Sequence, residues 1–128
     1  DAKKKSKNKL PTWYHSAHIY YPPKLNVEQC SSEITAKYKA SIIDGDKIAD
    51  ITGGFGIDTY FFSEKFQNVV HCEINKELSR IATHNFKQLN AILAPSPILK
   101  SRLLTGTLAF SKIRGVVEDP FIPSFFSS

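Results

Sequence analysis

Three glycines and one acidic residue are the part of this sequence best suited to binding a nucleotide. The glycines Gly53, Gly54 and Gly56 lie within DITGGFGIDT, residues 50–59, and Glu73 follows Gly53 by twenty positions. Glycine lets the backbone approach a ligand closely, and free N–H groups at the start of a helix favour a negatively charged group. A carboxylate at the end of a neighbouring strand can accept hydrogen bonds from both hydroxyls of a ribose. The combination predicts a site for a nucleotide cofactor.

These residues need a sheet edge and a helix start to bring them together, and the flanking pattern predicts both. Short apolar runs at Lys47–Thr52 and Asn68–Glu73 are typical of parallel strands that are buried on both faces. Apolar residues recur at helical spacing in Leu78–Leu89, and Ile57–Lys65 continues the glycine turn as a helix with Asp58 near its start. The order strand, glycine turn, helix, strand, helix predicts an α/β protein with a doubly wound, Rossmann-like parallel sheet.

The part before the first strand, residues 10–45, is expected to be an extension with one helix. Leu10–Lys24 is rich in aromatic residues but is interrupted by three prolines, which fix φ and remove backbone donors, so an irregular segment is predicted. Residues 28–43 are expected to form a helix that Ser31 or Ser32 caps. The apolar residues of this helix, spaced by four, are Ile34, Tyr38 and Ile42.

The first nine residues are rich in lysine and nearly free of apolar side chains, so a flexible basic tail is predicted. The lysines are Lys3, Lys4, Lys5, Lys7 and Lys9. The aromatic side chains of the next segment are Trp13, Tyr14, Tyr20 and Tyr21. Two interpretations stay open for these groups. Either they form a non-catalytic RNA-binding module through charge and base stacking, or the lysines are only solvated and the rings anchor the segment on the main domain.

Composition restricts the class of protein. The chain has 128 residues, of which 41% are hydrophobic and 23% charged, as expected of one soluble domain. No apolar run reaches the roughly 18–20 residues that cross a bilayer, so a cytoplasmic protein is expected. The cysteines, Cys30 and Cys72, form no CxxC pair, and no histidine cluster has metal-ligand spacing, so neither a disulfide scaffold nor a metal site is expected. The net charge of +5 favours a phosphate-bearing partner such as nucleic acid.

The details of the glycine turn bear on the choice of cofactor. The dinucleotide pattern G-x-G-x-x-G needs a third small residue, and Thr59 stands at that position after Gly54 and Gly56. Asp50 lies just before the glycines, where an acid facing the pocket would repel a pyrophosphate and attract the amino group of S-adenosylmethionine. S-adenosylmethionine is therefore favoured, and a nicotinamide- or flavin-binding oxidoreductase is the alternative. A P-loop is excluded, since no Gly-Lys-Ser/Thr follows the turn.

Four segments of the chain resemble a known family. They are KLPTWY, YYPPKLNVEQCSSEITAKYKA, DITGGFGIDTYFFS and HCEINKELSRIATHNFKQL. These strings are similar to the N-terminal part of the bacterial class I methyltransferases that are described as THUMP-like domain proteins, over about residues 9–90. The resemblance implies a Rossmann-like domain that binds S-adenosylmethionine and acts on RNA.

The same resemblance implies roles for particular residues. The cofactor loop corresponds to Asp50, Thr52, Gly53, Gly54 and Gly56, with Asp58 just beyond it. Glu73 would hold the ribose, and Asn75 would lie beside the adenine. Further candidates for the wall of the same pocket are Gln29, Ser31, Ser32 and Lys39.

The resemblance ends near Asn90, and the rest of the chain has no clear period. A strand is predicted at Gly115–Val117. Asp119 and Pro120 lie at about the distance at which the family has an Asp-Pro catalytic loop, so they are the catalytic candidates. Residues 46–128 are expected to form the Rossmann-like domain, but they have room for only two or three βα units of about 30 residues each. An incomplete sheet, the N-terminal half of a full one, is therefore expected.

Overall fold

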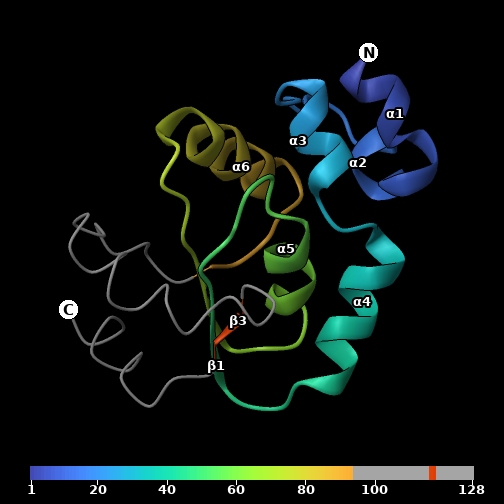
Figure 1. Cartoon of the computed structure of the whole chain (residues 1–128). Coiled ribbons are helices and arrows are strands. Elements are labelled where there is room, and N and C mark those ends of the chain that lie inside the picture. Colours follow the sequence, from blue (N-terminus) through green and yellow to red (C-terminus); the bar gives the residue numbers. More distant parts are fainter. Residues whose placement is uncertain (94–115, 118–128) are drawn as a thin grey trace.

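The computed structural model describes residues 1–93 and 116–117 of the chain (Figure 1). In the described part a small sheet has the strand order β2-β1-β3. The strands β1 (Lys47–Asp50) and β2 (Asn68–His71) pair in parallel, and β3 (Val116–Val117) pairs antiparallel with β1. The protein is therefore mixed α/β, as the sequence predicts, and is built on a parallel pair of strands.

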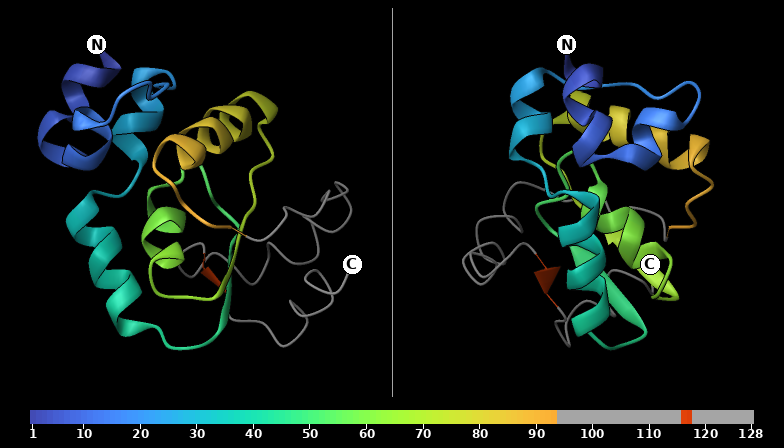
Figure 2. Two further views of the ribbon diagram at one scale, coloured as in Figure 1. Left: turned by 180° about the vertical axis from the view of Figure 1, so that it is seen from behind. Right: turned by 90° about the vertical axis from the view of Figure 1, so that its right-hand side faces the viewer.

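Helix α5 (Ile57–Ser63) connects the two parallel strands and packs between the sheet and helix α4 (Glu33–Ile42), as Figures 1 and 2 show. Helix α6 (Lys76–Gln88) follows β2. The predicted bounds of these strands and of α5 and α6 differ from the observed ones by two residues or fewer. Because β1 and β2 run in parallel, the loops that leave their carboxyl ends meet at one edge of the sheet.

The basic N-terminus is a helix, α1 (Ala2–Lys9), so the flexible tail predicted from its composition is wrong. Tertiary contacts supply what the composition lacks. Ser6 is fully buried, and Lys9 Nζ donates to two carbonyls in the last turn of α3 (Lys24–Gln29), at 2.9 and 2.7 Å. An ammonium group at the carboxyl end of a helix satisfies its unpaired carbonyls and opposes its dipole, so α1 and α3 stabilise each other.

The helix expected at residues 28–43 is split into two. Cys30 has an extended backbone that ends α3, and α4 begins after Ser32, whose backbone is also extended. The Ser32 side chain accepts a hydrogen bond from the Thr35 N–H at 3.2 Å, so the predicted capping role is confirmed. The cap starts a new helix in place of continuing the first one.

Helix α4 turns a different face to the core than its apolar spacing predicts. The apolar residues Ile34, Tyr38 and Ile42 are 82%, 63% and 51% exposed. The residues that α4 buries are Glu33, Ala36 and Ala40. The two alanines belong to the same hydrophobic core as the buried side chains of α5, the helix against which α4 packs.

One hydrophobic core joins the N-terminal extension to the α/β part. Trp13, in helix α2 (Pro11–His15), is fully buried. Its ring packs against Phe55, Tyr60 and Phe61 with centroid distances between 5.0 and 6.3 Å. The Trp13 ring thus anchors the aromatic segment on the main domain, which agrees with the second of the two interpretations of this segment.

A clamp between Tyr20 and Asn85 ties the extension to α6. The Tyr20 N–H donates to Asn85 Oδ1 and Asn85 Nδ2 donates to Tyr20 O, each at 2.8 Å. Asn85 is fully buried, and the half-exposed Tyr20 ring stacks on His84 with a centroid distance of 3.8 Å. The Asn85 amide supplies the donor and the acceptor that a neighbouring strand would otherwise give to this irregular segment.

Several predictions fall outside the described residues. The catalytic candidates Asp119 and Pro120 are among them, and so is Gly115, the first residue of the third predicted strand. The other two residues of that strand, Val116–Val117, form β3. Over the part of the chain that the structure describes, no helix is both long and apolar enough to cross a membrane.

Candidate functional site

The glycine turn connects β1 to α5 at the carboxyl edge of the sheet. The Gly53 N–H donates to Cys72 O at 3.0 Å, just beyond the end of β2, and the Gly56 N–H donates to Gly53 O at 2.8 Å. The first bond continues the pairing of the two strands, and the second closes the bend. The backbone of the turn is thus fixed against β2 before α5 begins.

Gly53 and Gly56 are glycines because protein atoms fill the space of a side chain. A Cβ on Gly53 would lie 2.3 Å from the His71 ring, and one on Gly56 would lie 2.5 Å from the Phe86 ring. Gly54 differs, because its φ is +50° and the nearest protein atom to an added Cβ is a carbonyl oxygen at 3.6 Å. A side chain at this position would compete with a ligand and not with the protein.

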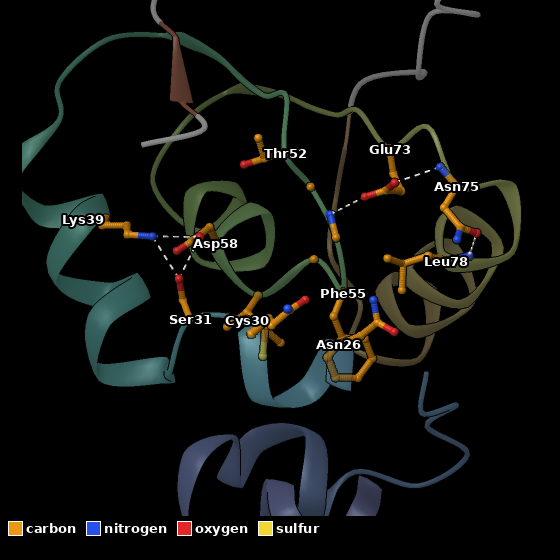
Figure 3. A pocket seen from close by; sticks show the side chains of 15 residues that line it. Asn26, Cys30, Ser31, Lys39, Thr52, Phe55, Asp58, Glu73, Asn75 and Leu78 are labelled. Atoms are coloured by element: carbon orange, nitrogen blue, oxygen red, sulfur yellow. Dashed lines mark hydrogen bonds and ion pairs between the residues drawn. The ribbon is translucent and has the colours of Figure 1, made fainter. Parts of the chain in front are cut away.

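Glu73 faces the glycine turn (Figure 3). Its Oε2 accepts a hydrogen bond from the Gly54 N–H at 2.9 Å, and its Oε1 accepts one from the Asn75 N–H at 2.8 Å. A carboxylate has about four lone-pair positions, so both oxygens can still accept hydrogen bonds from ligand hydroxyls. The structure brings together the turn and the acid that the sequence pairs.

A cavity of about 560 Å³ lies over the turn (Figure 3). Small-molecule sites have volumes of roughly 300–1,000 Å³, so the cavity is large enough for a nucleotide-sized ligand. The α/β part contributes Thr52, Gly53, Gly54, Phe55, Gly56, Ile57, Asp58, Glu73, Asn75 and Leu78 to its wall. The extension contributes Asn26, Gln29, Cys30, Ser31 and Lys39. Two of the predicted pocket residues are not on this wall, namely Ser32, which caps α4, and Asp50.

Asp50 lies behind the glycine turn, which corrects the expectation that it faces a ligand. It is 3% exposed, its Oδ2 accepts from Thr59 Oγ1 at 2.7 Å, and its Oδ1 accepts from the Thr52 N–H at 3.3 Å. Burial, helped by the nearby Asp58 carboxylate, raises the pKa of Asp50 to about 7. Thr59 thus stands where the dinucleotide pattern has its third glycine, and its hydroxyl ties α5 to β1.

Asn75 is the N-cap residue of helix α6. Its Oδ1 accepts a hydrogen bond from the Leu78 N–H at 3.1 Å, which is the bonding of an N-cap residue. Asn75 lines the cavity beside Glu73, as the resemblance implies, but the oxygen of its side chain is engaged in capping. Its contribution to the site therefore includes fixing the start of α6 next to the acid.

Ser31, Lys39 and Asp58 form a polar cluster at the other end of the cavity from Glu73 (Figure 3). Lys39 Nζ donates to Ser31 Oγ at 2.9 Å and to Asp58 Oδ2 at 3.0 Å, and Ser31 Oγ lies 3.0 Å from the same Oδ2. The side chains of Lys39 and Asp58 are 22% and 20% exposed. This ion pair is partly shielded from water, so its charges interact more strongly than they would at the surface.

His71 supports this site from outside the cavity wall, and no sequence motif distinguishes it from the other three histidines of the chain. It is 6% exposed, its Nε2 lies 3.3 Å from Gly54 O, and its ring packs edge-on against Phe86. Burial lowers the pKa of His71. Its ring supports the glycine turn from below, and its position at the end of β2, beside Asp50, is the signal that could have found it.

Neither cysteine has the properties of a nucleophile. Burial raises the pKa of Cys72 to about 12, and burial also raises the pKa of Cys30. Cys72 is thus a small buried residue just beyond the end of β2. No three His, Cys, Asp or Glu side chains within residues 1–93 gather into a group that could hold a metal ion.

Comparison with solved structures gives a match that bears on this site. The chain is similar to a crystal structure of a protein from Porphyromonas gingivalis W83 to which a methyltransferase function has been ascribed, with a TM-score of 0.63 and 36% sequence identity. This likeness supports the methyltransferase class. The match covers 68% of this chain and 22% of the methyltransferase, so the chain spans about a fifth of its neighbour's length.

At 36% identity, the likeness to the methyltransferase concerns the sequence as well as the fold. No protein-family model matches the chain, and no curated protein matches it either. The parallel pair of strands with its glycine turn agrees with a partial methyltransferase fold.

Proposed function

We propose that this chain carries the S-adenosylmethionine site of a class I, THUMP-like methyltransferase with a Rossmann-like sheet. The observation that carries the proposal is the 2.9 Å hydrogen bond from the Gly54 N–H to Glu73 Oε2 at the edge of a ligand-sized cavity. It sets a backbone turn and a carboxylate against one space, at the carboxyl ends of adjacent parallel strands, where such folds bind nucleotides. The likeness to the Porphyromonas gingivalis protein agrees with this proposal.

The residues present fit such a cofactor. Glu73 would accept hydrogen bonds from the ribose hydroxyls, and Leu78, which lines the cavity near Asn75, would offer an apolar surface to the adenine. The wall carries two carboxylates, Glu73 and Asp58, and one ammonium group, Lys39, so its formal charge of −1 favours a cationic ligand over an anionic one. When bound, S-adenosylmethionine supplies a methyl group on a positively charged sulfur. The chain itself contributes binding and orientation, and orientation can supply a large part of the rate enhancement of a bimolecular transfer.

Isothermal titration with S-adenosylhomocysteine tests the proposal. We expect saturable binding to one site, together with a rise in the unfolding temperature. At a ligand concentration of about 100 times Kd, the free energy of unfolding should increase by about 2.7 kcal/mol. Absence of both heat and thermal shift at millimolar ligand, in a chain that circular dichroism shows to be folded, would contradict the proposal.

A nicotinamide- or flavin-dependent oxidoreductase is the second candidate, because it would use the same kind of glycine turn. Two observations count against it. The side chains of the cavity wall carry a formal charge of −1, from Glu73 and Asp58 against Lys39, which would repel a pyrophosphate, and Thr59 fills the position of the third glycine. Thermal-shift measurements with NADH and with S-adenosylhomocysteine, side by side, separate the candidates, since a larger shift with NADH would favour the oxidoreductase.

We further propose RNA as the methyl acceptor, in the cytoplasm, on the basis of the net charge of +5 and the basic helix α1. Two lysines of α1 are engaged by oxygen atoms of α3, since Lys9 binds carbonyls there and Lys5 pairs with Glu28 at 3.7 Å. The other three are Lys4, Lys7 and Lys3, whose Nζ lies 5.8 Å from the centroid of the Tyr14 ring. These exposed ammonium groups are suited to phosphate contacts.

Fluorescence anisotropy with single-stranded RNA tests this acceptor class. Changing Lys3, Lys4 and Lys7 together to Gln should weaken binding and lower the slope of log K against log salt by about 2, at roughly 0.7 for each phosphate that the variant no longer binds. An unchanged slope would contradict the proposal. RNA binding that persists in Gly54→Asp, in a chain that binds no adenosine ligand, would instead favour the non-catalytic RNA-binding module.

A further inference from the structure

The rings of Tyr20 and His84 form a stacked pair at the surface of the protein. Their centroids are 3.8 Å apart, and their planes differ by 7°. Tyr20 is 57% exposed although His84 covers one face of its ring, so the opposite face and the edge of the ring are open to solvent. The pair lines neither the cavity over the glycine turn nor the hydrophobic core. An aromatic surface is thus exposed outside the site of the cofactor.

Hydrogen bonds on both sides fix the stacked pair in place. The Asn85 amide holds the backbone N–H and the backbone C=O of Tyr20, each at 2.8 Å. On the other side, His84 Nε2 lies 2.7 Å from the carbonyl oxygen of His18. The φ of His18 is +58°, in the left-handed region that residues other than glycine seldom adopt. Because the rings are held before a ligand arrives, a ligand that binds them loses little of its affinity to ordering the protein.

Basic side chains of helix α6 flank the stacked pair. Arg80 lies one turn before His84 and Lys87 lies three positions after it, and these spacings make side chains neighbours on a helix surface. Both are exposed, and neither forms an ion pair within residues 1–93. With Lys76, the exposed charges of α6 are three cations against the one carboxylate of Glu77. An open aromatic ring beside cations is the combination on which single-stranded nucleic acids bind, since bases stack on the ring and phosphates meet the cations.

We infer that the stacked pair is a platform for one base of a single-stranded RNA, with Arg80 and Lys87 contacting the phosphates next to that base. The inference rests on the proposed RNA acceptor and gives it a contact surface outside the cofactor cavity. The structure distinguishes between the aromatic residues of the extension, because Trp13 is fully buried whereas Tyr20 presents an open ring. Every base has a flat aromatic face, so the platform would position RNA without selecting its sequence.

Fluorescence anisotropy with a labelled oligouridylate of about ten nucleotides tests the platform on the native 128-residue chain. Tyr20→Leu removes the ring but keeps an apolar side chain, so it should weaken binding by roughly 5- to 150-fold, the effect of losing one stacked base. Tyr20→Phe keeps the ring and should bind as tightly as the native chain. Tyr38→Leu is the matched control, because Tyr38 is also exposed, at 63%, but lies on α4.

The dependence on salt separates stacking from charge. Tyr20→Leu should leave the slope of log K against log salt unchanged, because it removes no phosphate contact. Arg80→Gln combined with Lys87→Gln should lower this slope by about 1.4, at roughly 0.7 for each contact. In double-stranded RNA of the same length the bases are paired and stacked inside the helix, so Tyr20→Leu should bind it as the native chain does.

The outcomes separate the platform from the proposed function. Equal affinity of the native chain and Tyr20→Leu for the oligouridylate, or an equal loss in Tyr38→Leu, overturns the platform and leaves the RNA acceptor standing. Absence of RNA binding by the native chain overturns both, and titration with S-adenosylhomocysteine then decides on the cofactor site alone. If Tyr20→Leu does not fold, the native chain is titrated with an abasic strand of the same length and charge. A preference of less than about fivefold for the strand with bases overturns the platform.

Discussion

The Thr59 hydroxyl donates a 2.7 Å hydrogen bond to Asp50 Oδ2, and both side chains are buried. This bond joins the first turn of α5 to the last residue of β1, across the glycine turn. The turn is therefore held in part by a titratable group that water does not reach, and its stability should respond to pH.

The stability of the native protein, relative to Asp50→Asn, should fall as the pH rises from about 4 to about 7. In the folded state Asp50 keeps its proton up to a pKa of about 7, whereas the ordinary value is 3.8. Between these values folding takes up a proton, so raising the pH removes stability, by about 4 kcal/mol in total. Urea unfolding of both proteins across this range measures the difference, in which the contributions of shared groups such as His71 cancel. A difference that does not depend on pH would show that Asp50 ionises normally.

Gly54→Asn should abolish binding of S-adenosylhomocysteine while it leaves the free energy of unfolding within about 1 kcal/mol of the native value. Asparagine tolerates a φ of +50° better than most side chains do, and the added atoms would enter the cavity. Titration calorimetry and urea unfolding check the two parts of this prediction. Normal binding by a folded variant would mean that ligands do not approach the turn at Gly54.

Gly53→Ala provides the contrast to Gly54→Asn. An added Cβ would lie 2.3 Å from the His71 ring, which cannot move away without disturbing the core. We expect a loss of about 1–3 kcal/mol in the free energy of unfolding, measured in urea. If Gly53→Ala is as stable as the native protein, the His71 ring does not pack closely under the turn at Gly53.

Glu73→Gln should weaken S-adenosylhomocysteine by roughly 10- to 100-fold, because hydrogen bonds to a charged acceptor contribute about 1.5–3 kcal/mol. The amide keeps the shape of the side chain but loses the charge and one acceptor. Glu77→Gln is the matched control, since Glu77 is exposed in the first turn of α6 and does not line the cavity. Titration of both variants should show a loss in the first one only, and equal affinities would remove Glu73 from the ribose site.

Asn85→Ala should lower the free energy of unfolding by about 2–4 kcal/mol, because it leaves the N–H and the C=O of Tyr20 without their partner. Gln88→Ala, at an exposed position of the same helix, should change it by less than about 0.5 kcal/mol. Thermal or urea unfolding checks both values. Similar stabilities for the two variants would mean that the clamp contributes little.

The edge of the sheet could be predicted from the sequence because its signals are local. Apolar runs at β1 and β2 define the strands, and a parallel pair has to bring the loops after both strands to one edge. The meeting of Gly54 with Glu73, 19 positions away, follows from that constraint. The positions of the glycines also predict where the turn lies. The sequence pattern does not show why Gly53 has to be a glycine, because the space of its side chain is filled by the His71 ring from the neighbouring strand.

The cluster of Ser31, Lys39 and Asp58 could not be derived from local signals, since it depends on how α4 packs against α5. The apolar spacing of α4 points to the face with Ile34, which is exposed, so the spacing gives the wrong orientation for the helix. For α1 the error has a similar cause. Counting apolar side chains misses the bonds that Lys9 makes to the carbonyls of α3.

The clamp between Tyr20 and Asn85 spans 65 positions of the chain, and this sets an order on events during synthesis. Contacts between distant residues form only after the intervening chain has closed into a loop, which is slow compared with helix formation. The aromatic stretch is synthesised before α6, but it has to wait for α6 before it can settle. A segment that is made early among the described residues is thus fixed only after a later one has folded.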